Sequence, residues 1–317
     1  MAGSLITKSD SHVDVPLSMF SHKLGPGDGF IADQLFPVQS VAKESDKYFK
    51  VGNEDIQTNY ETLRADTDRA KEIKISASTD SYQTEEHALA ALLTDRQRAN
   101  ADSQLRIEQQ LVTVLTHNIL MGFEKRIETI VTDTAQITQT AVPSIKWDVG
   151  DSTSTIEADI DLAKETVAKN CGYNANVIVI PPIVAQPVKR SPEIRDIRKY
   201  VESGLTMNGD LPSTLFGLRV LIPGSIEDAR KLNATSSSLA RIWAQDKVLV
   251  AYINPNPGAF SNGLGISFRL NIGPGGVGSR VRRWRDPDRV GDKYEVALNQ
   301  DEKLVDATCG YIIDDVL

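Results

Sequence analysis

A glycine-rich hexapeptide near the C-terminus has a spacing that could bind a dinucleotide. Residues Gly273–Gly278, GPGGVG, match the GxGxxG pattern, in which bare backbone approaches a pyrophosphate. That chemistry requires a helix beginning at the last glycine, with the phosphate at its N-terminus. The next residues, SRVRRWRDPDR, alternate in polarity and contain Pro287, so they do not predict such a helix. We therefore interpret the hexapeptide as a flexible turn and predict no cofactor.

A basic segment follows this turn and surrounds Trp284. Its arginines are Arg280, Arg282, Arg283, Arg285 and Arg289. Arginines interleaved with an aromatic residue could contact a phosphate backbone. In a strand, however, Arg283 and Arg285 share one face, Arg282 and Trp284 share the other, and Asp286 and Asp288 neutralise part of the charge. We favour salt bridges between subunits over contact with nucleic acid or a merely solvated face.

The cysteines and histidines show no metal-binding or catalytic spacing. Cys171 and Cys309 lack a CxxC or Cys/His pattern, so we expect two buried free thiols. The histidines are His12, His22, His87 and His117, without an HxxxH or HExxH pair, and we predict no metal. The carboxylate pairs at 286/288 and 314/315 have no partner histidines and are interpreted as solvated or salt-bridged. With no GxSxG and no Ser/His/Asp arrangement, the sequence predicts no enzyme.

Composition and charge narrow the class of protein. The chain has 317 residues, 40% of them hydrophobic and 25% charged, which is typical of a soluble globular protein. Its apolar runs are far too short to cross a bilayer, and the start, MAGSLITKSDSHVDVP, lacks a secretory pattern. We therefore expect a chain of cytosolic origin without a membrane partner. The formal net charge of -8 argues against sequence-specific DNA binding.

The N-terminal third does not look self-contained. Residues 1–45 mix Gly and Pro with isolated apolar residues such as Phe30 and Phe36, a pattern typical of an arm that anchors on another surface. KYFKV and KEIKIS alternate apolar with charged residues and predict two strands with one solvated face. The polar stretch between them gives a long hairpin, which would be only marginally stable by itself.

The strongest helical pattern runs over 102–131. Its apolar stripe comprises Ile107, Leu111, Val114, Leu115, Ile119, Phe123, Ile127 and Ile130. Such a helix would be about 40–45 Å long, since each residue adds about 1.5 Å. That length is unusual in a globular domain, where helices average three to four turns.

Residues 155–270 are predicted to form an α/β unit. Ser154 and Glu157 form a capping box for a helix that ends at Gly172, and an apolar strand follows at Val177–Ile180. The prolines after it end the strand and direct the chain to a helix capped by Ser191. That second helix ends at Gly204. LFGLRVLIPGS and KVLVAYINP predict further buried strands, and GISFRLNI, KYEVALN and GYIIDDV predict strands after residue 258.

The order of these segments resembles the major capsid proteins of tailed bacteriophages, which have the Hong Kong 97-like fold. NVIVIPPIVAQPVKRSPEIRDIRKYV resembles the family's strand, turn and helix, and CGYIIDDVL resembles its terminal strand. LFGLRVLIPGS followed by SSLARIWAQDKVLVAYINP resembles the next strand pair. The resemblance implies an α+β fold with an arm at 1–45, an extended β-hairpin loop at 46–88, a peripheral domain at 89–154 with a spine helix, an axial domain at 155–268 and a return to the peripheral domain at 269–317.

The resemblance also implies a function and its partners. The chain would assemble into hexamers and pentamers that enclose double-stranded DNA, which it would contact non-specifically, in a shell assembled in the host cytoplasm. Portal and scaffolding proteins are implied as partners, and a decoration protein is compatible with it. Because the arm starts almost at Met1, a separate scaffold or a previously processed chain is expected. The expected intersubunit contacts are Phe30, Phe36, Arg64, Asp66, Asp68, Arg69, Lys71, Arg282, Arg283, Arg285 and Asp286.

Two alternatives remain open at this point. An encapsulin-type nanocompartment shell shares the fold and encloses cargo enzymes, although a Gly/Pro-rich N-terminus differs from the helix usual there. A cytosolic α/β enzyme that uses the Gly273–Gly278 loop is the second alternative, and it predicts a compact monomer or dimer stabilised by nucleotide.

Overall fold

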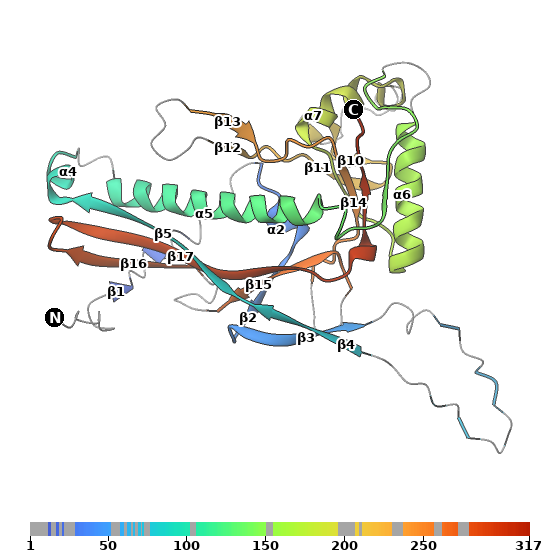
Figure 1. Ribbon diagram of the computed structural model, residues 1–317, viewed down its shortest axis with the longest axis horizontal. Helices are drawn as coiled ribbons and strands as arrows, with labels where there is room; N and C mark the ends of the chain where they lie inside the picture. Colours follow the sequence, from blue (N-terminus) through green and yellow to red (C-terminus); the bar gives the residue numbers. More distant parts are fainter. Residues whose placement is uncertain are drawn as a thin grey trace.

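The computed structural model is an elongated molecule with a long helix and a sheet at one end and a compact α/β body at the other (Figure 1). It describes residues 29–51, 77–101, 106–149, 155–195, 211–229, 237–256, 262–271 and 279–317, with the short segments 12–13, 17–18, 21, 58–59, 62–64, 66, 69–70, 72 and 207–208. The predicted turn at Gly273–Gly278 lies outside these residues.

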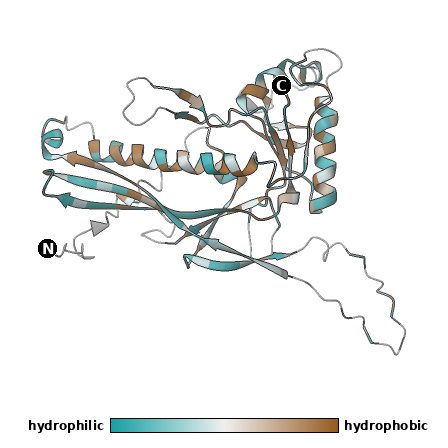
Figure 2. Cartoon of the chain, viewed as in Figure 1, coloured by the Kyte–Doolittle hydropathy of each residue, from teal (hydrophilic) through white to brown (hydrophobic). Residues whose placement is uncertain are grey.

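The elongated end is built on a six-stranded sheet, here called the long sheet. Its order is β1 (His12–Val13), β16 (Ser279–Asp286), β17 (Gly291–Leu304), β15 (Gly265–Leu270) and β2 (Val38–Val41), with β5 (Glu85–Thr94) paired to β17. The β17 strand pairs with β16 and β5 along its first part and with β15 at its end, all antiparallel. Figure 2 shows many hydrophilic residues along these long strands, as expected where one face of a sheet meets solvent.

Helix α5 (Ile107–Val131) covers the long sheet and confirms the predicted long helix. With 25 residues it spans about 37 Å. Leu115 and Ile119 pack with Tyr294 and Val296 of β17. The predicted stripe is wrong at Val114, which is 59% exposed, whereas Val112 is buried in its place.

The compact body holds a second six-stranded sheet, here called the compact sheet. Its order is β10 (Thr214–Leu215), β11 (Leu218–Leu221), β7 (Val177–Val179), β14 (Val248–Ala251), β18 (Gly310–Ile313) and β6 (Thr140–Ala141). The β11–β7 and β18–β6 pairs are parallel, and β7–β14 and β14–β18 are antiparallel. Strands β7, β14 and β18 are buried along their whole length, which explains their uninterrupted apolar runs (Figure 2).

The last strand differs from expectation. We expected the C-terminal strands to complete the peripheral domain, but β18 lies beside β14 in the compact sheet, while β16 and β17 belong to the long sheet. The reason is its composition, because GYII has no polar residue to place on a solvated face.

Two helices flank the compact sheet. Helix α6 (Ile156–Cys171) ends at Gly172, whose φ of 80° is left-handed, so the predicted glycine stop is confirmed. Its N-cap residue is Thr155, and Ser154 of the predicted capping box lies outside the described residues.

The double proline ends β7 as predicted, but it also begins a helix that we did not predict. Helix α7 (Pro182–Arg190) starts at Pro182, because proline suits the first helical turn, where no N–H partner is needed. A further helical segment starts at Pro192, and the Ile194 N–H donates to Ser191 Oγ at 3.4 Å, as a cap. Its predicted end at Gly204 lies outside the described residues.

Short elements connect and extend these layers. They are α2 (Ala32–Leu35), α4 (Asp95–Ala99), the 3-10 turn η1 (Ala307–Cys309), and the two-stranded ribbons β3 (Ser45–Val51) with β4 (Ala77–Gln83), β8 (Met207–Asn208) with β9 (Leu211–Pro212), and β12 (Ile226–Asp228) with β13 (Leu239–Arg241). The predicted strand KYFKV is confirmed within β3, which pairs with β4; the predicted strand KEIKIS lies outside the described residues apart from Glu72. Among the described residues, no helix combines the length and apolar character that a membrane span requires.

Candidate functional site

A buried carboxylate joins three parts of the chain at the junction of the two sheets. Glu124 of α5 is fully buried and accepts hydrogen bonds from the backbone N–H groups of Ile31, at 3.0 Å, and Ala32, at 2.8 Å. Its other oxygen accepts from Trp243 Nε1 at 2.7 Å, on the segment that follows β13. One side chain therefore fixes the arm, the long helix and the compact body to one another.

Burial raises the pKa of Glu124, and the three N–H donors oppose that shift. Four residues along α5, Glu128 accepts from Gln245 Nε2 at 2.9 Å. Lys125 donates to Glu227 of β12 at 2.7 Å. Three successive polar contacts thus secure the segment around β12 and β13 to the helix.

The described part of the predicted arm, around residues 31–36, packs into the chain's own core, which corrects the expectation for Phe36. Leu35 and Phe36 are both 0% exposed. The Phe36 ring lies so close to Gly265 that a Cβ there would come within 2.4 Å of it. Phe36 therefore has no surface to offer a neighbouring subunit. Phe30 is only partly buried and stacks edge-on with His117, with ring centroids 5.2 Å apart.

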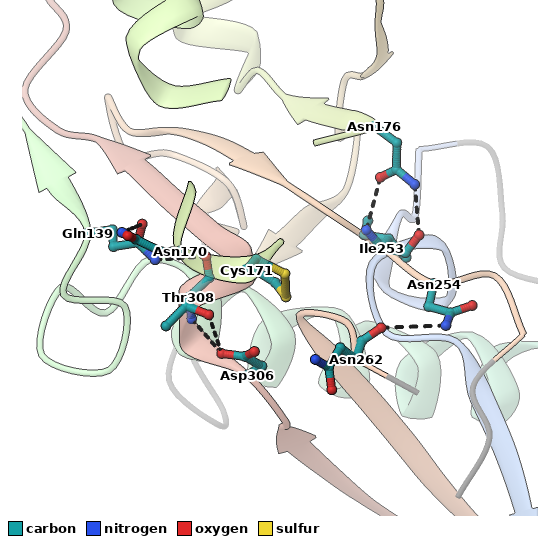
Figure 3. Close-up of a disulfide and its surroundings, with 10 residues drawn as sticks. Gln139, Asn170, Cys171, Asn176, Ile253, Asn254, Asn262, Asp306 and Thr308 are labelled. Atoms are coloured by element: carbon teal, nitrogen blue, oxygen red, sulfur yellow. Dashed lines mark hydrogen bonds between the residues drawn. A yellow bond between two sulfur atoms is a disulfide. The ribbon is translucent and has the colours of Figure 1, made fainter. Parts of the chain in front are cut away.

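The cysteines form a disulfide, so the prediction of two free thiols is wrong. Cys171, at the end of α6, is bonded to Cys309 of η1, with both residues fully buried and their Cα atoms 5.0 Å apart (Figure 3). Beside it, Asp306 Oδ1 accepts from the Thr308 N–H at 2.8 Å. Gln139 Nε2 donates to the Thr308 carbonyl at 2.8 Å. The bond links α6, the first helix of the compact body, to the 3-10 turn directly before its last strand.

The disulfide also excludes a metal site at a cluster of potential ligands around it. Cys171, Asp306 and Cys309 place potential ligand atoms within 4.8 Å of one another. The two sulfur atoms are bonded to each other, however, and a disulfide sulfur is not a thiolate ligand. Within the described residues this is the one cluster of that kind, and its chemistry is structural.

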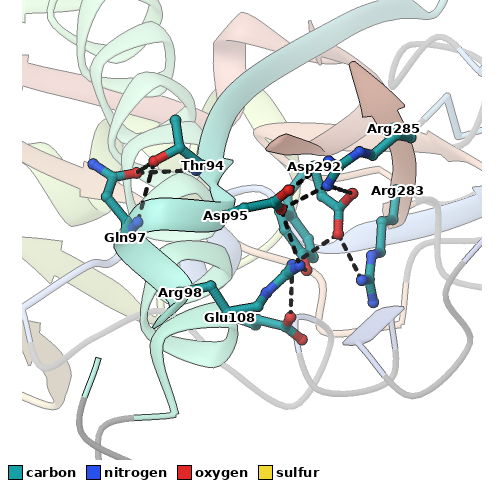
Figure 4. Close-up of polar contacts among 9 residues, drawn as sticks. Thr94, Asp95, Gln97, Arg98, Glu108, Arg283, Arg285 and Asp292 are labelled. Atoms are coloured by element: carbon teal, nitrogen blue, oxygen red, sulfur yellow. Dashed lines mark hydrogen bonds and ion pairs between the residues drawn. The ribbon is translucent and has the colours of Figure 1, made fainter. Parts of the chain in front are cut away.

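An ion-pair network closes the far tip of the long sheet (Figure 4). Asp292 accepts from Arg98 and from Arg283, each at 2.7 Å, and lies 3.5 Å from Arg285. Arg98 also donates to Glu108 and to the Tyr294 hydroxyl, both at 3.1 Å. Burial opposes ionisation of Asp292, but Arg98 and Arg283 outweigh it and lower the pKa of Asp292 to about 2.

The arginines after the turn alternate as predicted. Arg283 and Arg285 reach Asp292 and Asp95 on one face, and Arg282 reaches Glu295 on the other. Asp286 pairs with Lys293 at 2.9 Å. These salt bridges lie within the chain, and the predicted contacts of the same residues between subunits stay a prediction. Arg283 and Arg285 keep 39% and 49% of their side-chain surface exposed.

The remaining predicted contact residues lie on the loop between β3 and β4. Arg64, Asp66 and Arg69 are exposed. Asp68 and Lys71 lie outside the described residues. Sequence reasoning missed Glu124 and Asp292 as organising residues, because a charged residue on an amphipathic helix or strand normally indicates the solvent side.

Comparison with known proteins identifies the fold. No protein-family model matches the sequence, and no curated protein is significantly similar to it. A phage-related protein from Bordetella bronchiseptica RB50 matches with a TM-score of 0.71 at 21% identity, over 96% of this chain and 98% of that chain.

Two further structures match at lower identity. The capsid structure of the cyanophage P-SCSP1u matches with a TM-score of 0.59 at 9% identity, over 99% of this chain and 91% of that chain. The holo-SrpI encapsulin complex from Synechococcus elongatus PCC 7942 matches with a TM-score of 0.54 at 13% identity, covering 89% and 86% of the two chains. The chain therefore has the α+β, Hong Kong 97-like fold that the sequence resemblance implied.

Proposed function

We propose that this chain is the major capsid protein of a tailed phage, which assembles into hexamers and pentamers around a double-stranded DNA genome. The observation that carries the proposal is the match of 89–99% of the chain to the capsid structures of the cyanophage P-SCSP1u and bacteriophage PhiM1. The fold also has the features of a shell subunit. An elongated body with a projecting ribbon and a polar loop offers many modest contacts, which become strong when a closed shell repeats them.

The resemblance assigns a role to each part of the subunit. The loop at 46–88 would lie over a neighbouring subunit, with Arg64, Asp66, Asp68, Arg69 and Lys71 setting the register by complementary charge. Phe30 and the tip residues Arg282, Arg283, Arg285 and Asp286 would meet further neighbours. The compact body would face the centre of each capsomer. Portal and scaffolding proteins would be the other partners, and the negative net charge would limit adhesion to packaged DNA.

An encapsulin-type shell is the second candidate. It is supported by the match to the encapsulin complex from Synechococcus elongatus PCC 7942. The two candidates share the subunit fold and differ in what the shell encloses. A nucleotide-using enzyme has less support, because the residues after the Gly273–Gly278 loop form strand β16, where dinucleotide binding requires a helix.

Electron microscopy of the native particle tests the proposal directly. We expect closed icosahedral shells whose absorbance ratio at 260 and 280 nm indicates nucleic acid. Shells filled with protein would favour the encapsulin candidate. Small discrete oligomers from the native source would refute both, and a nucleotide titration would then test the enzyme alternative.

A further inference from the structure

The β12–β13 ribbon exposes two large apolar side chains on the face that is turned away from its own chain. The register places Ile226 opposite Arg241 and Asp228 opposite Leu239. Since directly opposed residues and residues two apart share one face of a ribbon, these four side chains project from the same face. Glu227 projects from the other face, where it contacts Lys125 of α5. The four-residue face therefore points away from α5, above which Figure 1 draws the ribbon, and we call it the upper face.

The upper face is exposed but firmly held. Leu239 is 72% exposed and Ile226 is 50% exposed. An isolated two-stranded ribbon is marginally stable, and large apolar side chains on it normally need a cover. Yet the base of this ribbon is fixed, because Trp243 is buried and bonded to Glu124, and the Ile242 N–H donates to the Ser225 carbonyl at 3.2 Å. A rigid support thus holds two apolar side chains outward.

A second exposed ribbon face lies on the other side of the molecule. In β3–β4, Tyr48 and Tyr82 pack on Phe268, with ring centroids 5.2 and 4.5 Å apart. The opposite face carries Lys47 and Phe49, and Phe49 is 47% exposed. We call it the lower face. Figure 1 draws β3–β4 beyond the long sheet, on the side away from α5, and β12–β13 on the α5 side.

We infer that the upper face of one subunit binds the lower face of a second copy of this chain. Two different surfaces on opposite sides of a subunit make a head-to-tail contact, which closes into a ring when the rotation permits. This inference rests on the proposed shell function and assigns one surface pair within a capsomer. Each upper face then receives one lower face, and each subunit uses both.

The chemistry of the two faces is complementary. Packing Phe49 against Leu239 and Ile226 would cover the exposed apolar side chains of both ribbons. Lys47 lies two residues from Phe49 on the same face, about 6.5 Å along the strand. Asp228 lies directly across from Leu239, about 5 Å away. Arg241 lies at the other end of the upper face, across from Ile226, so the favoured orientation of the contact places Lys47 next to Asp228, where the charges are opposite.

Cysteine cross-linking between two variants tests this contact. The chain has two cysteines, which are buried and bonded to each other, so an introduced cysteine is the reactive thiol. Leu239→Cys chains and Phe49→Cys chains are assembled together and oxidised mildly, and non-reducing gels report linked dimers. We expect dimers in the mixed shells and at least tenfold fewer in shells of either variant alone. Ile183→Cys replaces Leu239→Cys in the control, because Ile183 is similarly exposed, at 49%, on α7.

Each outcome decides between alternatives. Closed shells without a link between Phe49→Cys and Leu239→Cys would overturn the inference and leave the shell function standing. A strong link among Leu239→Cys chains alone would show contact between two upper faces and would overturn it as well. Failure of the native chain to form any shell would refute the proposed function, and the inference with it.

Discussion

Replacing Asp292 by asparagine should destabilise the tip of the long sheet in a pH-dependent way. The asparagine keeps the shape of the side chain but removes the charge that faces Arg98, Arg283 and Arg285 (Figure 4). The carboxyl pKa falls from an ordinary 3.8 to about 2 in the folded chain. Since one pKa unit corresponds to about 1.4 kcal/mol, the full shift is worth about 2.4 kcal/mol at neutral pH. The arginines are partly exposed, so solvent screening reduces this to about 1–2 kcal/mol.

The sign of the pH dependence follows from the direction of the shift. A lowered folded-state pKa means that the unfolded chain binds the proton more readily, so the contribution is complete above about pH 4. It is lost as the pH falls through about 2. The destabilisation of Asp292→Asn relative to the native chain should therefore be largest at neutral pH and vanish in strong acid.

Denaturant unfolding of the unassembled full chain, followed from pH 7 to pH 2, measures this difference. Asp288→Asn provides the control, because Asp288 is exposed in the turn that links β16 to β17 and the substitution removes the same charge. An Asp292→Asn chain as stable as the native one at pH 7 would refute the reasoning. So would a stability difference that persists unchanged at pH 2, since the charge would then not be its source.

The other interior contacts give three further predictions. Glu124→Ala should lower the free energy of unfolding by about 2–4 kcal/mol, because it leaves the N–H groups of Ile31, Ala32 and Trp243 without an acceptor. Hydrogen exchange should accelerate at the backbone amides of Ile31 and Ala32, and unchanged protection there would contradict the prediction. Cys171→Ser should lower the free energy of unfolding by about 2–5 kcal/mol, because it removes the disulfide. A reductant should lower the melting temperature of the native chain and leave that of the variant unchanged. Gly265→Ala should destabilise by about 1–3 kcal/mol through its clash with Phe36, and adding Phe36→Leu should recover part of the loss; a larger loss in the double variant would argue against the clash.

The sequence patterns predicted the elements that local periodicity determines. The stripe of α5 is confirmed at Leu115, Ile119, Phe123 and Ile127, because each of these side chains points into a core. The periodic pattern gave the wrong assignment where α5 contacts both the arm and the compact body. Periodicity assigns Glu124 to the solvent side, and its burial depends on Trp243, 119 positions away in the chain. A pattern with a period of 3.6 residues carries no information about that partner.

The same limit explains the disulfide and the last strand. Cys171 and Cys309 are separated by 138 positions, and their spacing gives no sign that α6 and η1 meet. GYII was predicted as a strand, but its place beside β14 depends on which sheet offers a fully buried edge. The double proline was predicted to end β7, and its second role in starting α7 was missed because a capped helix nine residues later fitted the pattern better.

The hydrogen bonds of Glu124 link the arm to the β12–β13 ribbon, which carries the upper face. The carboxylate is buried, so it needs all of its donors, and these come from the start of α2 on one side and from Trp243 below β13 on the other. If the arm were not packed, Glu124 would lose two of its three hydrogen bonds, and the segment that carries β13 would lose part of its anchor. Packing of Leu35 and Phe36 into the core and rigid presentation of Leu239 are therefore energetically coupled. A subunit built in this way exposes a firm apolar face only after its own arm is in place, which favours contacts between completely folded copies over contacts between partly folded ones.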